Sequence, residues 1–129
     1  MKGKVLYIED ETFFAKTISH KLEKYGFDVD LAADGESGVK ALAEEAYDVV
    51  LLDLVLPQMG GFDVLKKMRT IEKNKTTPVV ILSNLSSDSD KRTAEELGAR
   101  EFYVKMNSTP SNILALVASI IGQEERPTR

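Results

Sequence analysis

The sequence predicts a doubly wound α/β fold, (βα)5, built on a five-stranded parallel sheet, and two features support this prediction. Short apolar runs alternate five times along the chain with stretches of helical period, which is the pattern of successive βα units. The third and fourth runs are almost continuously apolar, as strands buried on both faces must be. Because crossovers between parallel strands are right-handed, helices should cover both faces, giving a three-layer α/β/α sandwich.

The strands are expected near residues 4–8, 28–32, 48–52, 78–83 and 101–104. Between the first two, apolar residues recur at spacings of four and three: Phe14, Ile18, Leu22 and Tyr25. This spacing predicts an amphipathic helix that stops at Gly26. The pair Asp34-Gly35 predicts a turn and cap, followed by a second helix that runs through Leu42 to Ala46.

Three further helices follow the later strands. After Gly60-Gly61, apolar residues at helical spacing predict a third helix, and Ser86-Ser87-Asp88 offers caps for a fourth that ends near Gly98. Thr109-Pro110 pairs an N-cap with proline at the first helical position, so a fifth helix should begin there. We expect Gly122 to end it.

Length and composition indicate one ordinary domain. The 129 residues suffice for a single core, which we assign to residues 1–122, with residues 123–129 as a short charged C-terminal tail. A net charge of −4 gives no general attraction to nucleic acid or anionic lipid, so neither is an expected partner. No segment resembles a signal peptide or a bilayer span, and a cytoplasmic protein is expected. The absence of cysteine excludes disulfides and thiolate metal sites.

Four of the apolar runs end on polar residues suited to phosphoryl chemistry. Glu9-Asp10-Glu11 follows the first run, Asp53 the third, Ser83 the fourth and Lys105 the fifth. The carboxyl ends of parallel strands lie together on one edge of the sheet, where open α/β folds bind their ligands. These residues are therefore expected to converge on one site.

The expected site is rich in carboxylates. Ionised together, Glu9, Asp10 and Asp53 would repel one another, and a hard divalent cation such as Mg²⁺ relieves that repulsion. Lys105 can pair with Asp53 at rest and with a phosphoryl oxygen after transfer, and Ser83 adds a hydroxyl donor. An aspartate in these surroundings is equipped to attack phosphorus and to hold an acyl phosphate.

The motifs also resemble a known family. They are, in order, Ile8-Glu9-Asp10-Glu11, Asp53-Leu54-Val55-Leu56-Pro57 with Gly61, Ile81-Leu82-Ser83, and Gly98-Ala99-Arg100-Glu101-Phe102-Tyr103-Val104-Lys105. Their order and spacing are similar to those of the receiver domain of two-component response regulators, in particular the chemotaxis regulators. The resemblance covers essentially the whole chain and implies a flavodoxin-like fold.

The resemblance implies a role for each residue. Asp53 would accept a phosphoryl group from a sensor histidine kinase or a phosphotransfer protein. Asp10, Asp53 and the Val55 carbonyl would ligate Mg²⁺, with Glu9 acting through water or as a weaker ligand, while Ser83 and Lys105 would contact the phosphoryl group. Such a domain is a signalling switch, not an enzyme acting on other substrates, and it catalyses only its own phosphoryl transfer and autodephosphorylation.

Output is expected through a second part of the chain. Phe102, three residues before Lys105, falls at the position of an aromatic switch that the family couples to the hydroxyl of Ser83. The fourth helix, the fifth strand and the fifth helix would then bind a downstream protein or a second copy of the chain.

Several positions depart from the family pattern. Met106 stands where proline usually follows the lysine, Gly60 replaces an Asp or Asn, and Asn84 replaces a small residue and is expected to narrow the approach to Asp53. By the same resemblance, Val55 and Leu85 occupy positions through which the family tunes the lifetime of the phosphorylated state. Since both are apolar, neither can orient an attacking water, and we expect a long lifetime.

Three other functions share part of this pattern. A phosphohydrolase of the haloacid dehalogenase type would also use Asp and Mg²⁺, but it requires a second Asp where this chain has Val55. A flavodoxin-like cofactor carrier would need a phosphate-cradling first loop, which Glu9-Asp10-Glu11 opposes. The third is a degenerate receiver that only binds proteins, and the presence of every reacting group argues against it. The chain is expected to be a stand-alone regulator or the excised receiver of a longer one.

Overall fold

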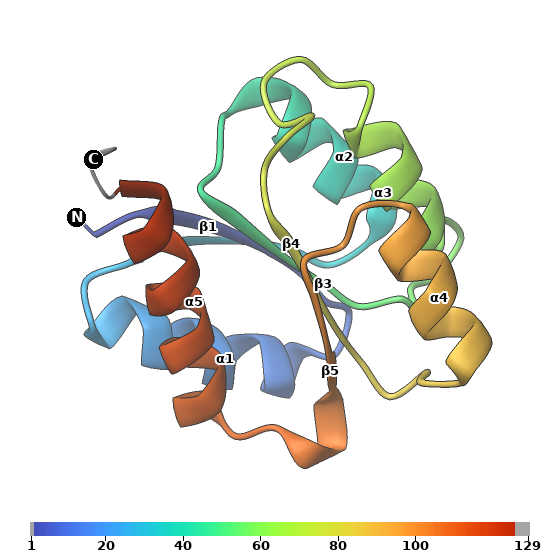
Figure 1. Ribbon diagram of the computed structural model, residues 1–129. Coiled ribbons are helices and arrows are strands. Elements are labelled where there is room, and N and C mark those ends of the chain that lie inside the picture. The colour runs from blue at the N-terminus through green and yellow to red at the C-terminus, as the bar shows by residue number, and fades with distance from the viewer. Residues whose placement is uncertain (1, 126–129) are drawn as a thin grey trace.

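Five parallel strands form one sheet in the computed structural model, which describes residues 2–125 (Figure 1). They are β1 (Lys4–Ile8), β2 (Asp28–Ala32), β3 (Val49–Leu52), β4 (Val79–Ser83) and β5 (Glu101–Val104). Their order across the sheet is β2-β1-β3-β4-β5, so β3 lies at the centre and β2 and β5 form the edges. Each strand begins and ends within one residue of its predicted bounds.

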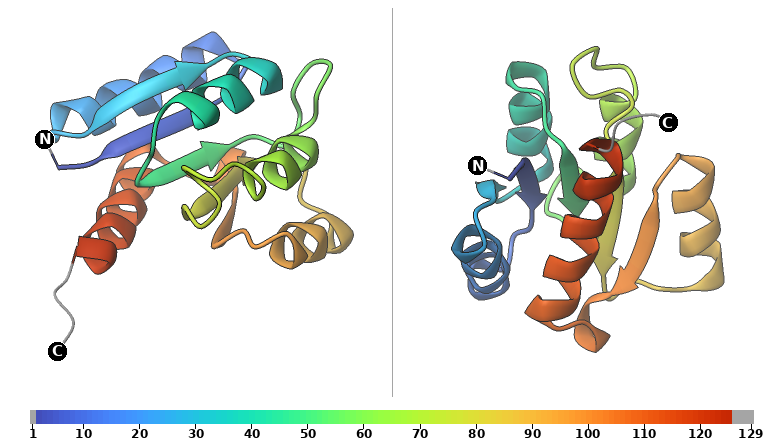
Figure 2. Two further views of the ribbon diagram at one scale, coloured as in Figure 1. Left: turned by 90° about the horizontal axis from the view of Figure 1, so that it is seen from above. Right: turned by 60° about the vertical axis from the view of Figure 1, so that its left-hand side comes forward.

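The helices are α1 (Thr12–Lys24), α2 (Gly35–Glu44), α3 (Gly61–Met68), α4 (Asp88–Glu96) and α5 (Pro110–Glu125), with a short 3₁₀ turn, η1 (Lys105–Asn107), between β5 and α5. Figures 1 and 2 show α1 and α5 on one face of the sheet and α2, α3 and α4 on the other. The predicted doubly wound, three-layer α/β/α sandwich is therefore confirmed.

The sheet separates two apolar cores because successive residues of a strand face opposite sides. One core lies under α1 and α5 and includes Val5, Tyr7, Leu51, Leu82, Ile113 and Val117. The other lies under α2, α3 and α4 and includes Leu6, Ile8, Leu52, Val64, Ile81 and Ala94. Both cores extend to the carboxyl ends of the strands, so the residues that follow those ends are attached to well-packed backbone.

Two predicted helix ends are wrong. The second helix was expected to reach Ala46, but α2 ends at Glu44 and Ala46 is exposed, so it adds nothing to the apolar face. The fifth helix passes through Gly122 to Glu125. Gly26 and Gly98 take the positive φ of a helix-ending glycine, at 98° and 86°, whereas Gly122 does not.

Residues 123–125, at the start of the predicted tail, continue α5. Residues 126–129, the rest of the predicted tail, lie outside the described residues. At the other end of the helix the prediction is confirmed, because α5 begins at Pro110 and the hydroxyl of Thr109 accepts a hydrogen bond from the Asn112 amide at 3.1 Å.

A buried side chain organises the amino ends of β3 and β4. The Asn74 amide donates to the carbonyls of Leu42 and Glu45 at 2.7 and 2.6 Å, and its oxygen accepts from the Tyr47 amide at 2.9 Å and the Thr77 hydroxyl at 3.0 Å. These five residues are called the amino-edge cluster below. They join the end of α2 to the loops that lead into β3 and β4.

No helix among residues 2–125 combines the length and the apolar character that crossing a bilayer requires.

Candidate functional site

The carboxyl edge of the sheet brings together the residues predicted to react. Glu9 and Asp53 directly follow β1 and β3, which pair as neighbours through Ile8 and Leu52. Lys105 follows β5 and begins η1. Although Glu9 and Lys105 are 96 residues apart in sequence, their side chains are in direct contact.

Lys105 lies at the centre of the cluster. Its ammonium group is 2.8 Å from a carboxylate oxygen of Asp53, 2.8 Å from one of Glu11, and 2.9 and 3.0 Å from the two oxygens of Glu9. It also lies 5.0 Å from the centre of the Phe14 ring. Lys105, Glu9 and Asp53 are all at least 96% buried. One buried cation thus holds three carboxylates, and the predicted resting pair of Lys105 with Asp53 is present.

The electrostatics of the cluster follow from this burial. Burial opposes the charge on Lys105, but hydrogen bonds to Asp53, Glu11 and Glu9 outweigh it and raise the pKa of the ammonium above its usual value. Burial also raises the pKa of Glu9, against the lowering effect of Lys105. Three carboxylates share one ammonium, so if all are ionised they carry more negative charge than Lys105 compensates.

Tyr7 supports the cluster from below. Its side chain is fully buried and its hydroxyl donates to Glu9 Oε1 at 3.0 Å. Burial and the neighbouring carboxylate of Glu9 both raise the pKa of the Tyr7 hydroxyl, so it stays protonated as a donor. Sequence reasoning missed this residue, although residues two apart on a strand share one face and Tyr7 precedes Glu9 by two.

Glu11 was also missed as a site residue. Its side chain is 63% exposed, yet its carboxylate contacts the buried ammonium of Lys105. The motif that contains it was recognised, but Glu11 lies three residues beyond the end of β1, where strand periodicity no longer predicts the direction of a side chain.

A metal ion fits the oxygen atoms beside this cluster. Carboxylate oxygens of Glu9, Asp10 and Asp53 all lie within 4.8 Å of one another, and Asp10 is exposed to incoming ions. An open cavity of about 250 Å³ is lined by Asp10, Glu11, Asp53, Val55, Asn84 and Lys105. A set of oxygen donors beside open space suits Mg²⁺, which keeps several waters.

The other oxygen of Asp53 is held by the backbone. Asp53 Oδ1 accepts a hydrogen bond from the Val55 amide at 3.1 Å, while Oδ2 faces Lys105. This fixes the orientation of the carboxylate at the floor of the cavity. The Val55 side chain is 58% exposed at its rim.

Ser83, unlike Asp53 and Lys105, does not reach the cavity. It is fully buried at the end of β4, its hydroxyl oxygen accepts from the Leu85 amide at 3.3 Å, and it is not among the side chains that line the cavity. Leu85 is partly exposed, and Asn84 contributes to the cavity wall. A hydroxyl contact to a phosphoryl group would therefore require this segment to move.

Asn84 makes a contact that the sequence did not reveal. Its side-chain oxygen accepts a hydrogen bond from the Met106 amide at 2.8 Å. The described residues contain no cis peptide bond, so the bond between Lys105 and Met106, the first two residues of η1, is trans.

Phe102 lies on the other side of β5 from the first core. It is half-buried, packs against the core under α4, and lines a cavity of about 290 Å³ together with Lys91, Ala94 and Glu95 of α4. The predicted aromatic switch thus stands between β5 and α4, with open space beside its ring.

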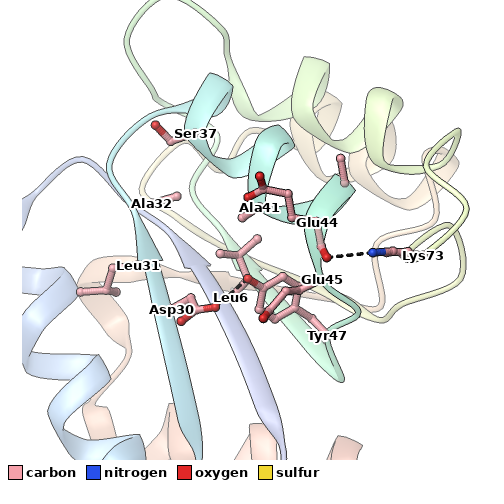
Figure 3. A pocket seen from close by; sticks show the side chains of 11 residues that line it. Leu6, Asp30, Leu31, Ala32, Ser37, Ala41, Glu44, Glu45, Tyr47 and Lys73 are labelled. Carbon is pink, nitrogen blue, oxygen red and sulfur yellow. Dashed lines mark hydrogen bonds between the residues drawn. The ribbon is translucent and has the colours of Figure 1, made fainter.

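A larger cavity, of about 830 Å³, lies away from this site between β2 and α2 (Figure 3). Two hydrogen bonds join residues of its wall: Tyr47 donates to Asp30 at 2.7 Å, and Lys73 donates to the Glu44 carbonyl at 2.8 Å. None of the residues predicted to react contributes to its wall.

Comparison with known proteins identifies a family for this chain. The sequence model of one protein family, the response regulator receiver domain, matches residues 5–118. Response regulator ArlR from Staphylococcus saprophyticus is 36% identical over 117 residues, which cover 91% of this chain and 50% of that protein. The chain therefore spans about half the length of the curated relatives it matches.

Two solved structures are similar over nearly their whole length. Chemotaxis protein CheY4 from Vibrio cholerae is 29% identical with a TM-score of 0.84, and the likeness covers 91% of this chain and 97% of that one. The BeF3-activated DrrB receiver domain is 30% identical with a TM-score of 0.83, over 95% and 99% of the two chains. Receiver domains are signalling domains that interact with histidine kinases and downstream effectors, and this chain belongs to the response regulator receiver domain family.

Proposed function

We propose that this chain is a phosphorylation switch in which Asp53 accepts a phosphoryl group from a histidine kinase or a phosphotransfer protein. The contact between Asp53 and the buried ammonium of Lys105 carries the proposal. A carboxylate oxygen of Asp53 attacks phosphorus, the bond from phosphorus to the donor nitrogen breaks, and the electron pair leaves with the donor. Lys105 then exchanges carboxylate oxygens for a phosphoryl oxygen without losing its charge partner.

Mg²⁺ is the proposed cofactor. Asp10, Asp53 and the Val55 carbonyl would hold it, with Glu9 acting through water or as a weaker ligand, and its charge would balance the negative charge of the phosphoryl oxygens. The mutual proximity of the Glu9, Asp10 and Asp53 oxygens supports this assignment. Because the ion would compensate carboxylates that Lys105 now holds, Lys105 would be able to move toward the phosphoryl group.

The proposed output surface consists of α4, β5 and α5. If the Ser83 hydroxyl moved toward the phosphoryl group, the segment that leads into α4 would move with it, because the Leu85 amide is bonded to this hydroxyl. The Phe102 ring has a cavity beside it into which it can turn. Of the nine residues of α4 only Ala94 is buried, so few apolar contacts oppose its displacement. A downstream protein or a second copy would bind this surface, and the domain would act in the cytoplasm without contacting nucleic acid or membrane itself.

The phosphorylated state is proposed to be long-lived. Val55 lines the cavity, and Leu85 is partly exposed next to Ser83. Both side chains are apolar, so neither can hold a water molecule in line with phosphorus. The same Val55 weighs against a haloacid dehalogenase type of phosphohydrolase, which needs an acid at that position.

Intact-mass measurement tests the assignment of Asp53. The full chain is incubated with Mg²⁺ and acetyl phosphate, and we expect one base-labile phosphoryl group on the wild type and none on Asp53→Asn. Asp63→Asn, which changes an exposed acid on α3, serves as the matched control and should be modified like the wild type. The same added mass on Asp53→Asn would refute the proposal.

A further inference from the structure

Two residues at which this chain departs from the family pattern are in contact with each other. Asn84 follows Ser83, Met106 follows Lys105, and the side-chain oxygen of Asn84 accepts a hydrogen bond from the Met106 amide at 2.8 Å. A proline at position 106 would have no N–H to donate. The contact thus depends on both departures at once.

The contact lies where the sheet ends. The last pair between β4 and β5 joins Ser83 to Val104, and the bond from Asn84 to Met106 continues this connection beyond the strands. Met106 is the second residue of η1, where the first amides have no partner inside the turn. The Asn84 side chain supplies that partner, and so fixes the start of the turn to the end of β4.

We propose that Asn84 is a positioning residue that, through the Met106 amide, holds the segments carrying Ser83 and Lys105 together over Asp53. This inference rests on the proposed phosphorylation of Asp53. With the two segments joined, the hydroxyl of Ser83 and the ammonium of Lys105 would approach the phosphoryl group as a pair, and water would find a smaller opening between them.

A simpler role is shielding by bulk, because Asn84 also lines the cavity above Asp53. The two roles make different predictions for two variants. Asn84→Leu keeps nearly the same size but removes the acceptor, whereas Asn84→Ala removes both. If the hydrogen bond matters, both variants lose the phosphoryl group faster; if bulk alone matters, only Asn84→Ala does.

The experiment measures phosphoryl decay on the full chain with Mg²⁺, after loading with acetyl phosphate. Since one hydrogen bond has a net value of about a factor of two to ten in an equilibrium or rate constant, we expect decay in Asn84→Leu and Asn84→Ala to be faster by roughly that factor. Asn107→Leu, an exposed amide on the same turn, is the matched control and should decay like the wild type.

A second readout follows the bond itself. Hydrogen exchange at the Met106 amide, observed by NMR in the unphosphorylated protein, should be faster in Asn84→Leu than in the wild type by a similar factor. An unchanged urea midpoint would show that the fold is intact. Decay of Asn84→Leu at the wild-type rate, or unchanged exchange at Met106, would overturn the inference and leave the proposed function standing. Failure of the wild type to acquire a phosphoryl group on Asp53 would instead defeat the proposed function, and the inference with it.

Discussion

A polar cluster is buried at the amino ends of the strands and another at their carboxyl ends. The two clusters differ in charge, not in hydrogen bonding. At the amino edge, Asn74 makes four hydrogen bonds to neutral groups. At the carboxyl edge, Lys105 contacts the carboxylates of Glu9, Glu11 and Asp53. Within the described residues no buried side-chain nitrogen or oxygen lacks a partner, so both clusters are satisfied as donors and acceptors.

The difference separates a structural cluster from a reactive one. The hydrogen bonds of Asn74 in the amino-edge cluster all join neutral groups, and each of these groups has its partner. The cluster therefore has no excess charge that a bound ion could neutralise. The carboxyl-edge cluster has a surplus of negative charge that a second cation can relieve, and its lysine can change partners without leaving a group unpaired. Complete hydrogen bonding alone therefore does not distinguish the two roles, whereas charge balance does.

The largest effect is expected for Lys105→Met. Removing the one cation leaves buried carboxylates uncompensated, and without Mg²⁺ the free energy of unfolding should fall by about 3–5 kcal/mol. Mg²⁺ should restore part of this loss, because it no longer competes with the ammonium for Glu9 and Asp53. Urea unfolding in chelator and in Mg²⁺ measures both effects, with the exposed Lys40→Met as control. Equal stabilisation of Lys105→Met and the wild type by Mg²⁺ would argue against the competition.

Asn74→Ala should have the next largest effect. It leaves the amide of Tyr47 and the carbonyls of Leu42 and Glu45 without their side-chain partner, and burial of such groups should lower the free energy of unfolding by about 2–4 kcal/mol. This loss should be the same with and without Mg²⁺, as urea unfolding can show. A loss that Mg²⁺ repairs would mean that the two edges are coupled.

Thr77→Val should have the smallest effect of the three. The Thr77 hydroxyl donates to Asn74 and lies 3.3 Å from the Tyr47 carbonyl, and valine keeps its shape while removing these bonds. We expect a loss of about 1 kcal/mol in urea unfolding, and unchanged phosphorylation per folded molecule. A loss as large as that of Asn74→Ala would show that the hydroxyl, not the amide, holds the cluster together.

The sequence predicted what depends on period and on order along the chain. Alternating apolar runs gave the strands within one residue, and the rule that parallel strands end together placed Asp53 beside Glu9. Two helix ends were misplaced, since whether Gly122 interrupts α5 depends on local backbone conformation that its identity does not fix.

Contacts between residues of separate loops could not be predicted from the sequence. The bond from Asn84 to Met106, and the contact of Glu11 with Lys105, each join residues from loops whose paths are set by packing rather than by period. The amino-edge cluster was missed for the same reason, because Asn74 stands in the polar loop between α3 and β4, whose composition does not indicate a buried side chain.

A crystal structure of the full chain with Mg²⁺ and beryllofluoride, a mimic of the phosphoryl group, would show whether Lys105 leaves its carboxylates when Asp53 carries the group. We expect beryllofluoride on Asp53, Mg²⁺ in contact with Asp10, Asp53 and the Val55 carbonyl, and the Lys105 ammonium moved from Glu9 and Glu11 to a fluoride. Beryllofluoride bound elsewhere, or bound to Asp53 with Lys105 still held by Glu9 and Glu11, would contradict this expectation.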